Sequence, residues 1–363
     1  MKASVSDRTG CTRREFCYSM STLLVSQTVK VREVGPQGTF GIASDSFQIR
    51  ARQIAQASGA EVNAAIPAEK FVDLCKSFGA DGCLMNLVQL TSRDSAYLRQ
   101  IRQSLEDKGM FLELSLDPQL FEDPSLLSSA AATARDLGVS RLQLATGGRR
   151  TEDFSDPGQW QEFLKHWQQR LQQAEPVFKQ SKLQFGVENH QDWLADELVE
   201  LLQKLGSPHI GATVDFSNNL ALLEDPLEAV QKLAPYAVSS HLKDAAVSEV
   251  EEGCMIADVP LGQGILPLAR LMELLRRAKS DIHFCLDMAT RDPVKIPFRD
   301  DSFWGAFGKR DTSRIDKFKS TILSRATTRS FPKISGMNSP QMRAVEDDNI
   351  RRSVAYAKRT LGL

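Results

Sequence analysis

The chain has 363 residues, of which 42% are hydrophobic and 25% charged, and its formal net charge is −1. This composition is typical of a globular protein with one large α/β domain. The balanced charge gives no overall attraction to nucleic acid or to an anionic membrane, and no apolar run reaches the roughly 18 residues of a membrane span. The six cysteines show no CxxC spacing, which argues against a zinc cluster or a disulfide framework.

Residues 1–39 are treated as an N-terminal extension outside the fold. Residues 12–16 have the sequence TRREF, which resembles a twin-arginine export signal, and a mildly apolar stretch follows them. Serine and glutamine interrupt that stretch, and no clear cleavage site follows it. We therefore expect a bacterial protein that is periplasmic if this signal functions and cytoplasmic if it does not.

From residue 40 onward, short apolar runs typical of strands alternate with amphipathic stretches typical of helices. The predicted strands lie at residues 40–47, 83–90, 110–116, 140–148, 183–189, 210–216, 237–244 and 282–290. The predicted helices lie at residues 67–80, 92–109, 123–138, 157–180, 194–206, 225–237 and 265–280. This alternation has the size and order of a closed (β/α)8 TIM barrel, which we place at residues 40–297.

An open doubly wound sheet is the main alternative to the barrel. A nucleotide-binding sheet of that kind is expected to carry a glycine fingerprint after an early strand, and the sequence FGIASDSFQ at residues 40–48 lacks one. Residues 298–363 do not continue the alternation. We expect them to form a C-terminal extension with a helical tail that packs on the barrel or on a partner subunit, so a homo-oligomer is also considered.

Four predicted strands end on side chains that commonly bind metal ions. These are Glu188, Asp215, His241 and Asp287. In a barrel, the same ends of successive parallel strands meet at one rim. One such carboxylate alone would usually be a helix cap or a solvated charge, but four in register favour a metal site. Three carboxylates and one imidazole suit Mn2+ best, with Mg2+, Co2+ or Zn2+ as alternatives.

The motifs GVENH, TVDFSNN, SSHLKD, PLGQG and LDMATRDP, in this order, resemble those of the sugar phosphate isomerase/epimerase superfamily. This superfamily contains the xylose isomerase-like TIM barrels and the endonuclease IV type of repair enzyme, and the resemblance covers residues 40–297. Its epimerases hold one divalent metal with Glu, Asp, His and Glu, which implies Glu188, Asp215, His241 and Asp287 as ligands here. The resemblance also implies that Glu188 and Asp287 are the catalytic pair that removes and returns a proton.

Four further residues near this rim are candidates for substrate binding. By the ENH pattern of the family, Asn189 and His190 orient substrate hydroxyls or the ligand carboxylate. Lys243 is expected to bind a substrate oxygen or to stabilise an enediolate. Arg291 is expected to hold a carboxylate of the substrate or of the metal site. A packed or solvent-facing histidine is the alternative for His190, and a surface lysine is the alternative for Lys243.

Two positions depart from the family pattern. Asp287 stands where the epimerases carry Glu, so its carboxylate reaches about 1.5 Å less far, and misplacing a catalytic group by about 1 Å can cost on the order of a hundredfold in rate. Asn218 stands where the epimerases and endonucleases often carry histidine. With five histidines in the chain, the trinuclear zinc site of an endonuclease IV-like enzyme is disfavoured.

The sequence therefore predicts a divalent-metal-dependent isomerase or epimerase that acts on a sugar or sugar derivative through a metal-stabilised enediolate. A lyase that dehydrates a keto-inositol or keto-sugar would use the same intermediate and is the main alternative. A non-catalytic carbohydrate-binding barrel and an endonuclease IV-like enzyme are less favoured. The expected partner is a small carbohydrate, with no nucleic acid and no membrane span.

Overall fold

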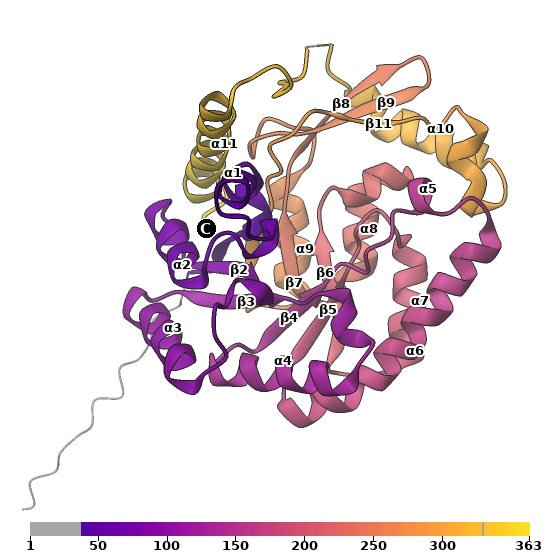
Figure 1. The fold of residues 1–363 in the computed structure, drawn as a ribbon. Helices are drawn as coiled ribbons and strands as arrows, with labels where there is room; N and C mark the ends of the chain where they lie inside the picture. The colour runs from indigo at the N-terminus through magenta and orange to yellow at the C-terminus, as the bar shows by residue number, and fades with distance from the viewer. Residues whose placement is uncertain (1–37, 329) are drawn as a thin grey trace, which may run out of the picture. The chain divides into compact units, whose positions relative to one another are not determined.

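The computed structural model describes residues 38–328 and 330–363, and its centre is a closed barrel of eight parallel strands (Figure 1). The order around the barrel is β1-β10-β7-β6-β5-β4-β3-β2. The barrel strands are β1 (Phe40–Ala43), β2 (Gly82–Asn86), β3 (Phe111–Ser115), β4 (Arg141–Leu144), β5 (Gln184–Glu188), β6 (Ile210–Asp215), β7 (Ala237–Leu242) and β10 (Phe284–Leu286). The predicted (β/α)8 barrel is confirmed.

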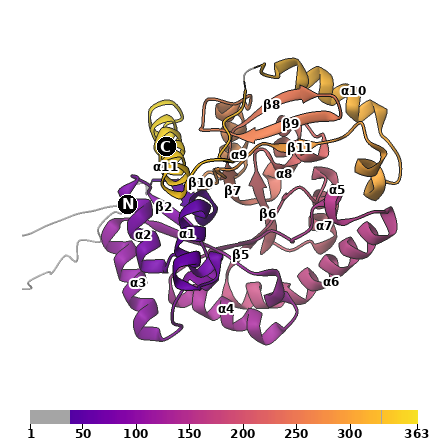
Figure 2. The ribbon, with the colours of Figure 1, turned by 45° about the horizontal axis from the view of Figure 1, so that its top comes forward.

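Helices surround this barrel (Figures 1 and 2). They are α1 (Gln48–Ser58), α2 (Ala68–Ser77), α3 (Ser95–Lys108), α4 (Pro124–Asp136), α5 (Arg150–Asp153), α6 (Pro157–Ser181), α7 (Ala195–Leu205), α8 (Pro226–Leu233), α9 (Leu268–Ala278), α10 (Thr312–Thr321) and α11 (Ser339–Thr360). Short 3-10 helices lie at Ser44–Phe47, Val62–Ala64, Leu87–Gln89, Pro118–Phe121, Asn218–Leu222, Ala234–Tyr236, Asp301–Phe307 and Leu323–Arg325.

Three of the helices, α4, α6 and α8, start at an Asp-Pro pair in the sequence. The carboxylates of Asp123, Asp156 and Asp225 each accept a hydrogen bond from a backbone N–H of the first turn. The following proline fits the first helical position, where no intrahelical N–H bond is needed. These starts fix where each helix returns along the outside of the barrel.

The two-residue repeat of the strands separates an apolar outer face from an inner face that carries both polar side chains and a small apolar cluster of Ala43, Leu84, Phe111 and Cys285. Outward side chains such as Ile42, Leu114, Val187, Val214 and Leu286 belong to the main hydrophobic core. The intervening side chains point toward the barrel axis. At the C-terminal end of the axis, this repeat places the four side chains of the candidate metal site.

The lower part of the barrel axis holds a buried ionic network from four strands or strand ends. The carboxylate of Glu113 on β3 accepts a hydrogen bond from Ser239 on β7 and lies 2.6 Å from Nδ1 of His283. Nη1 of Arg141 on β4 lies 3.6 Å from the same carboxylate. The network links opposite walls of the barrel below the site.

A small antiparallel sheet follows the seventh barrel strand and was not predicted. It contains β8 (Ala245–Val250), β9 (Gly253–Asp258) and β11 (Val294–Ile296), in the order β11-β9-β8 (Figure 2). The residues EVEEG surround its hairpin turn, and no helical stretch separates β8 from β9, so this segment does not follow the strand–helix alternation by which the barrel strands were identified. The sheet brings Asp258 toward the barrel mouth.

The first strand is shorter than predicted, and the helix after it was missed. Strand β1 ends at Ala43, and residues 44–47 turn through a 3-10 helix into α1. Only Ile49, Ala51 and Ala55 are buried on α1, so the helix has a weak apolar stripe. Its first turn is instead held by Glu346 of α11, whose carboxylate accepts hydrogen bonds from the backbone N–H groups of Ile49 and Arg50 at 2.6 and 3.1 Å.

The C-terminal extension packs on the barrel through buried aromatic side chains, including Phe303 and Trp304, and through α11. The predicted export signal at residues 12–16 lies outside the described residues. In the part of the chain that the structure describes, no helix is both long enough and apolar enough to cross a bilayer.

Candidate metal centre and active site

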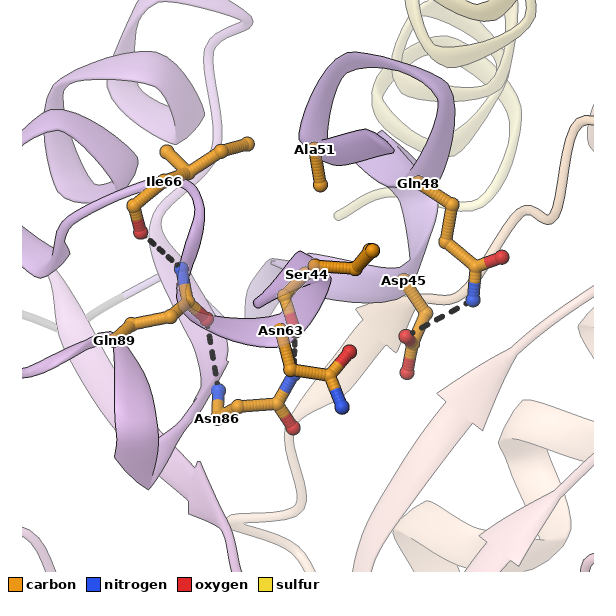
Figure 3. Close-up of a pocket in the computed structure, with 9 residues that line it drawn as sticks. Ser44, Asp45, Gln48, Ala51, Asn63, Ile66, Asn86 and Gln89 are labelled. Atoms are coloured by element: carbon orange, nitrogen blue, oxygen red, sulfur yellow. Dashed lines mark hydrogen bonds between the residues drawn. The ribbon is translucent and has the colours of Figure 1, made fainter. Parts of the chain in front are cut away.

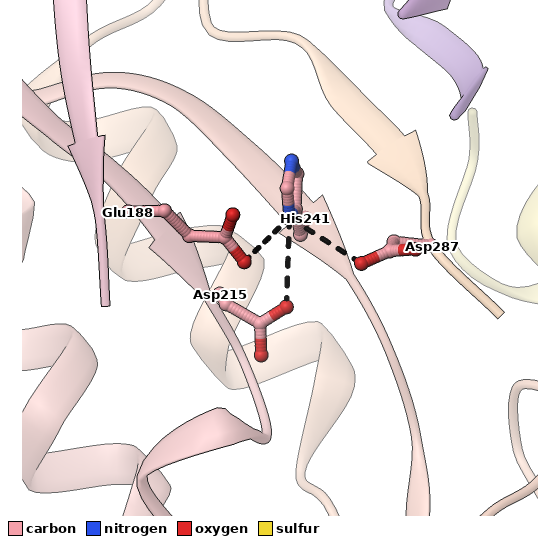
Figure 4. A group of neighbouring side chains, drawn as sticks. All are labelled: Glu188, Asp215, His241 and Asp287. Carbon is pink, nitrogen blue, oxygen red and sulfur yellow. Dashed lines mark hydrogen bonds and ion pairs between the residues drawn. The ribbon is translucent and has the colours of Figure 1, made fainter. Parts of the chain in front are cut away.

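The structure brings the four predicted metal ligands together at the C-terminal mouth of the barrel. Glu188 ends β5, Asp215 ends β6, His241 lies in β7 and Asp287 follows β10. One ligand atom from each residue lies within 4.8 Å of the others, and all four residues are buried. Figure 4 shows the four side chains converging on one another. This group is called the four-residue cluster below.

His241 lies at the centre of the cluster. Its Nδ1 atom lies 3.1 Å from Oε1 of Glu188, 3.7 Å from Oδ2 of Asp215 and 3.5 Å from Oδ2 of Asp287. Its other ring nitrogen, Nε2, lies 2.9 Å from Oε1 of Gln143. An amide oxygen accepts hydrogen bonds, so Nε2 carries a proton and Nδ1 is the atom available to a cation.

Asp215 has one oxygen fixed by the backbone and one directed into the cluster. Oδ1 accepts hydrogen bonds from the backbone N–H groups of Ser217 and Asn218, at 2.8 and 2.7 Å. Oδ2 is buried and has no hydrogen-bond partner within the described part of the chain. Its contact with Nζ of Lys243, at 3.2 Å, is an ion pair without hydrogen-bond geometry. A buried carboxylate oxygen that accepts no hydrogen bond is a suitable ligand for a cation.

Glu188 is also held through one oxygen only. Oε1 accepts a hydrogen bond from Nδ2 of Asn218 at 3.0 Å and faces His241. Oε2 has no hydrogen-bond partner among the residues that the structure describes. Asn218, which replaces the histidine of the family pattern, therefore holds Glu188 in place.

Lys243 is buried inside the site. Its Nζ atom lies 2.7 Å from Oδ2 of Asp287 and 3.2 Å from Oδ2 of Asp215. Burial lowers the pKa of Lys243, but the charges of Asp215 and Asp287 outweigh this and hold it well above its ordinary value. The ammonium group is thus part of the charge balance of the cluster.

Opposite charges dominate the other pKa shifts at this site. Burial raises the pKa of Glu188, but attraction to His241 and His190 brings it below its ordinary value. Burial also raises the pKa of Asp215, and Lys243 and His241 outweigh that effect. Burial lowers the pKa of His241, whereas Glu188 and Asp215 raise it well above its usual range, so a cation that binds Nδ1 must displace a proton from it. Glu188 and Asp215 are therefore ionised at neutral pH and attract positive charge.

The other predicted substrate-binding residues are Asn189, His190 and Arg291, and each makes different contacts. Asn189 is buried and bonds the backbone of Asp215 on both sides: its Oδ1 accepts from the Asp215 N–H and its Nδ2 donates to the Asp215 carbonyl. His190 is partly exposed, with a buried Nδ1 that has no partner among the described residues. Arg291 pairs through Nε with Asp258 of β9 at 3.0 Å. Substrate binding by these residues stays a prediction.

Sequence reasoning missed three polar residues at the mouth. Gln143 lies in β4, and its only signal was its inward place in the strand repeat. Asp258 lies in the unpredicted small sheet. Asp45 follows β1 in a segment that was predicted to be strand. Each becomes recognisable only when the closed barrel brings its element beside the cluster.

The sequence model of the xylose isomerase-like TIM barrel family matches residues 72–302, which include the whole cluster. The chain belongs to this family. Over 96 residues it is 30% identical to the Escherichia coli K12 protein "Uncharacterized protein YihM", covering 26% of this chain and 29% of that one. Over 115 residues it is 28% identical to a 3-oxo-isoapionate decarboxylase of Pectobacterium atrosepticum, covering 30% of this chain and 40% of that one.

These two matches span less than half the length of the relatives. Among solved structures, a D-psicose 3-epimerase determined in the presence of D-fructose superposes with a TM-score of 0.56 at 14% identity. That superposition covers 90% of this chain and 100% of the epimerase. At this identity the likeness shows that the two proteins share the xylose isomerase-like fold.

Proposed function

We propose that this xylose isomerase-like barrel is a divalent-metal-dependent isomerase or epimerase of a sugar or sugar derivative. The convergence of Glu188, Asp215, His241 and Asp287 carries the proposal. The Oδ2 atom of Asp215, which accepts no hydrogen bond within the described chain, and the orientation of the His241 ring fit a bound cation, with Mn2+ as the proposed ion and Mg2+, Co2+ or Zn2+ as alternatives. The shared fold with a D-psicose 3-epimerase supports the carbohydrate class.

A divalent cation held by these four side chains would polarise a substrate carbonyl and stabilise the negative charge that develops when the neighbouring C–H loses its proton. Glu188 is the proposed base on one face. Its low pKa keeps it ionised, Oε1 is fixed by Asn218, and Oε2 is open to accept a proton. The fixed carboxylate needs little reorientation before the transfer.

Asp287 is the proposed acid and base on the opposite face. Oδ2 is held by Lys243 at 2.7 Å, and Oδ1 has no partner in the described chain. Lys243 therefore fixes the carboxylate that is one methylene shorter than the Glu of the family pattern. To act as the acid, Asp287 would first take a proton from solvent on Oδ1 and then transfer it to the substrate carbon, and the ammonium of Lys243 would stabilise the carboxylate that remains.

A lyase is the second candidate, and the same Lys243–Asp287 contact favours it. With Asp287 engaged by Lys243, the ammonium is the acid closest to this face, and it would protonate a leaving hydroxyl or a carbanion left by loss of carbon dioxide. A relative named as a 3-oxo-isoapionate decarboxylase supports this class. The two candidates share carbanion chemistry and differ in which bond breaks.

The test is incubation of the purified protein with Mn2+ in D2O and a panel of ketoses, keto-inositols, 3-keto-sugars and 3-oxo sugar acids, followed by NMR. An epimerase or isomerase gives deuterium beside the carbonyl together with an isomeric product. A lyase gives loss of water or of carbon dioxide. A panel in which no compound exchanges or reacts would contradict both candidates.

A further inference from the structure

A small cavity lies beside the barrel mouth, between α1, the loop that precedes α2 and the segments that follow β1 and β2 (Figure 3). Its polar lining consists of Ser44, Asp45, Gln48, Asn63, Asn86 and Gln89. The cavity measures about 20 Å³. Since one water molecule needs about 10–15 Å³ of such space, the cavity accepts one hydroxyl-sized group and is too small for a phosphate.

Most of this polar lining is already hydrogen-bonded within the protein. Nδ2 of Asn86 donates to Oγ of Ser44 at 3.1 Å. Oε1 of Gln89 accepts from the backbone N–H of Asn86 at 2.9 Å, and Nε2 of Gln89 donates to the carbonyl of Ile66 at 2.8 Å. These groups form rigid walls.

Two lining residues keep free hydrogen-bonding capacity. Oδ1 of Asp45 accepts from Nε2 of Gln48 at 3.2 Å, which leaves Oδ2 without a partner in the described chain. The amide of Asn63 makes no hydrogen bond with the described residues. A hydroxyl group is both donor and acceptor, so it can donate to Asp45 and accept from Nδ2 of Asn63. None of the described residues that line the cavity is a lysine, arginine or histidine.

The segment carrying Asp45 is tied to the residues on either side of Asp287. Strand β1 pairs with β10, with Ile42 opposite Leu286, and paired strands lie about 4.8 Å apart. Beyond the strands, Oγ of Ser46 donates to the carbonyl of Leu286 at 2.9 Å and accepts from the N–H of Met288 at 3.0 Å. Burial and the nearby charge of Asp287 raise the pKa of Asp45. Asp45 therefore lines the cavity and also feels the charge of Asp287 in the four-residue cluster.

We propose that this cavity, through Asp45 and Asn63, binds the terminal hydroxymethyl group of an unphosphorylated polyhydroxy ketone whose carbonyl end reacts at the cluster. The inference rests on the proposed function and specifies its substrate class. A terminal phosphate would exceed the cavity and would face the carboxylate of Asp45 without a cationic partner in the lining. A neutral hydroxyl satisfies both free groups.

The test compares three substrates with the full-length Mn2+ enzyme: a ketohexose from the panel, its terminal phosphate ester, and dihydroxyacetone, which lacks the far end. We expect kcat/KM to be at least about tenfold lower for the ester than for the ketohexose. We expect Asp45→Asn to lower kcat/KM for the ketohexose by about tenfold relative to kcat/KM for dihydroxyacetone. The change should come mainly from a higher KM for the ketohexose. Asn63→Ala, which changes an exposed side chain, should lower it in the same direction, and Glu61→Gln in the same loop is the matched control.

An ester that reacts as well as the ketohexose would overturn the proposal, as would an Asp45→Asn variant that slows both ketones equally. If the wild-type protein exchanges no compound, the proposed function fails, and calorimetric binding of the neutral ketoses decides the subsite separately. Binding that weakens about tenfold in Asp45→Asn supports the subsite. Binding that is absent, or unchanged in this variant, overturns it.

Discussion

Glu188 and Asp287 are held differently, and substitution should separate their roles. Glu188→Gln keeps the shape of the side chain but removes the proton acceptor, so solvent exchange should fall by about 10²–10⁴-fold. Asp287→Asn should lower epimer formation strongly while leaving part of the exchange at the Glu188 face. The measurement is NMR in D2O at saturating Mn2+, with exposed Glu200→Gln as control. Full epimerisation by Asp287→Asn would show that this pair is wrong.

Gln143 fixes the tautomer of His241 and should therefore affect metal affinity. Gln143→Leu removes the acceptor for the Nε2 proton and should weaken Mn2+ binding by about 10–100-fold, the range for residues that orient a metal-binding histidine. Titration calorimetry measures the dissociation constant directly. Gln103→Leu on the exposed face of α3 is the matched control. Equal affinities in the two variants would remove Gln143 from this role.

Glu113 should make the stability of the folded protein depend on pH in the acid range. Burial raises its pKa, but hydrogen bonding to and attraction by His283, together with Arg141, bring it below the ordinary value of 4.5. The Glu113 carboxylate therefore binds a proton more readily in the unfolded chain than in the folded protein. Its contribution to the stability of the fold is present above about pH 4.5 and is lost as the pH falls through the lower pKa of the folded state.

Glu113→Gln tests this pH dependence by comparison with the wild type. At pH 7 we expect the variant to be less stable by about 3 kcal/mol, because Arg141 and His283 lose a buried charged partner. Thermal melts from pH 7 down to pH 3.5 should show the gap in Tm closing in the acid range. A gap that stays constant or widens on acidification would contradict the assignment.

At the scale of elements, α11 holds the start of α1 through Glu346. Burial raises the pKa of this carboxyl to about 7, and its two oxygens accept hydrogen bonds from two backbone N–H groups of α1. Glu346→Ala should lower the free energy of unfolding by about 2 kcal/mol, since it leaves buried donors unpaired. Asp348→Ala, on the exposed side of α11, is the control. If both variants unfold at the same denaturant concentration, the contact between Glu346 and the start of α1 does not stabilise the protein.

The sequence was informative wherever an element follows its own periodicity. Strands such as β5 and β6 were predicted because each is a short apolar run, and α4 because Asp123 and Pro124 mark its start. Helix α1 was missed because a residue about 300 positions away, Glu346, holds its first turn. Strands β8 and β9 were missed because they pair with each other across a short turn, with no helix between them, and so fall outside the strand–helix alternation.

At the scale of the whole molecule, closure of the barrel converts separate strand ends into one site. Glu188 and Asp215 were predicted as ligands because each ends a strand, and parallel strands share a rim. The partners of these residues could not be predicted in this way, because Gln143 contacts His241 only across the closed barrel. Asp45 likewise gains its neighbours from the pairing of the first strand with the last.

The central claim is that four side chains from four barrel strand ends bind one divalent cation. Crystals grown with Mn2+ and measured for anomalous scattering test it without reference to a substrate. We predict one strong peak about 2.1 Å from a ligand atom of each of Glu188, Asp215, His241 and Asp287, with Oδ2 of Asp215 among them. A map with no peak at the four-residue cluster and with Lys243 still in contact with Asp287 would contradict the claim. A map with Mn2+ bound only elsewhere would also contradict it.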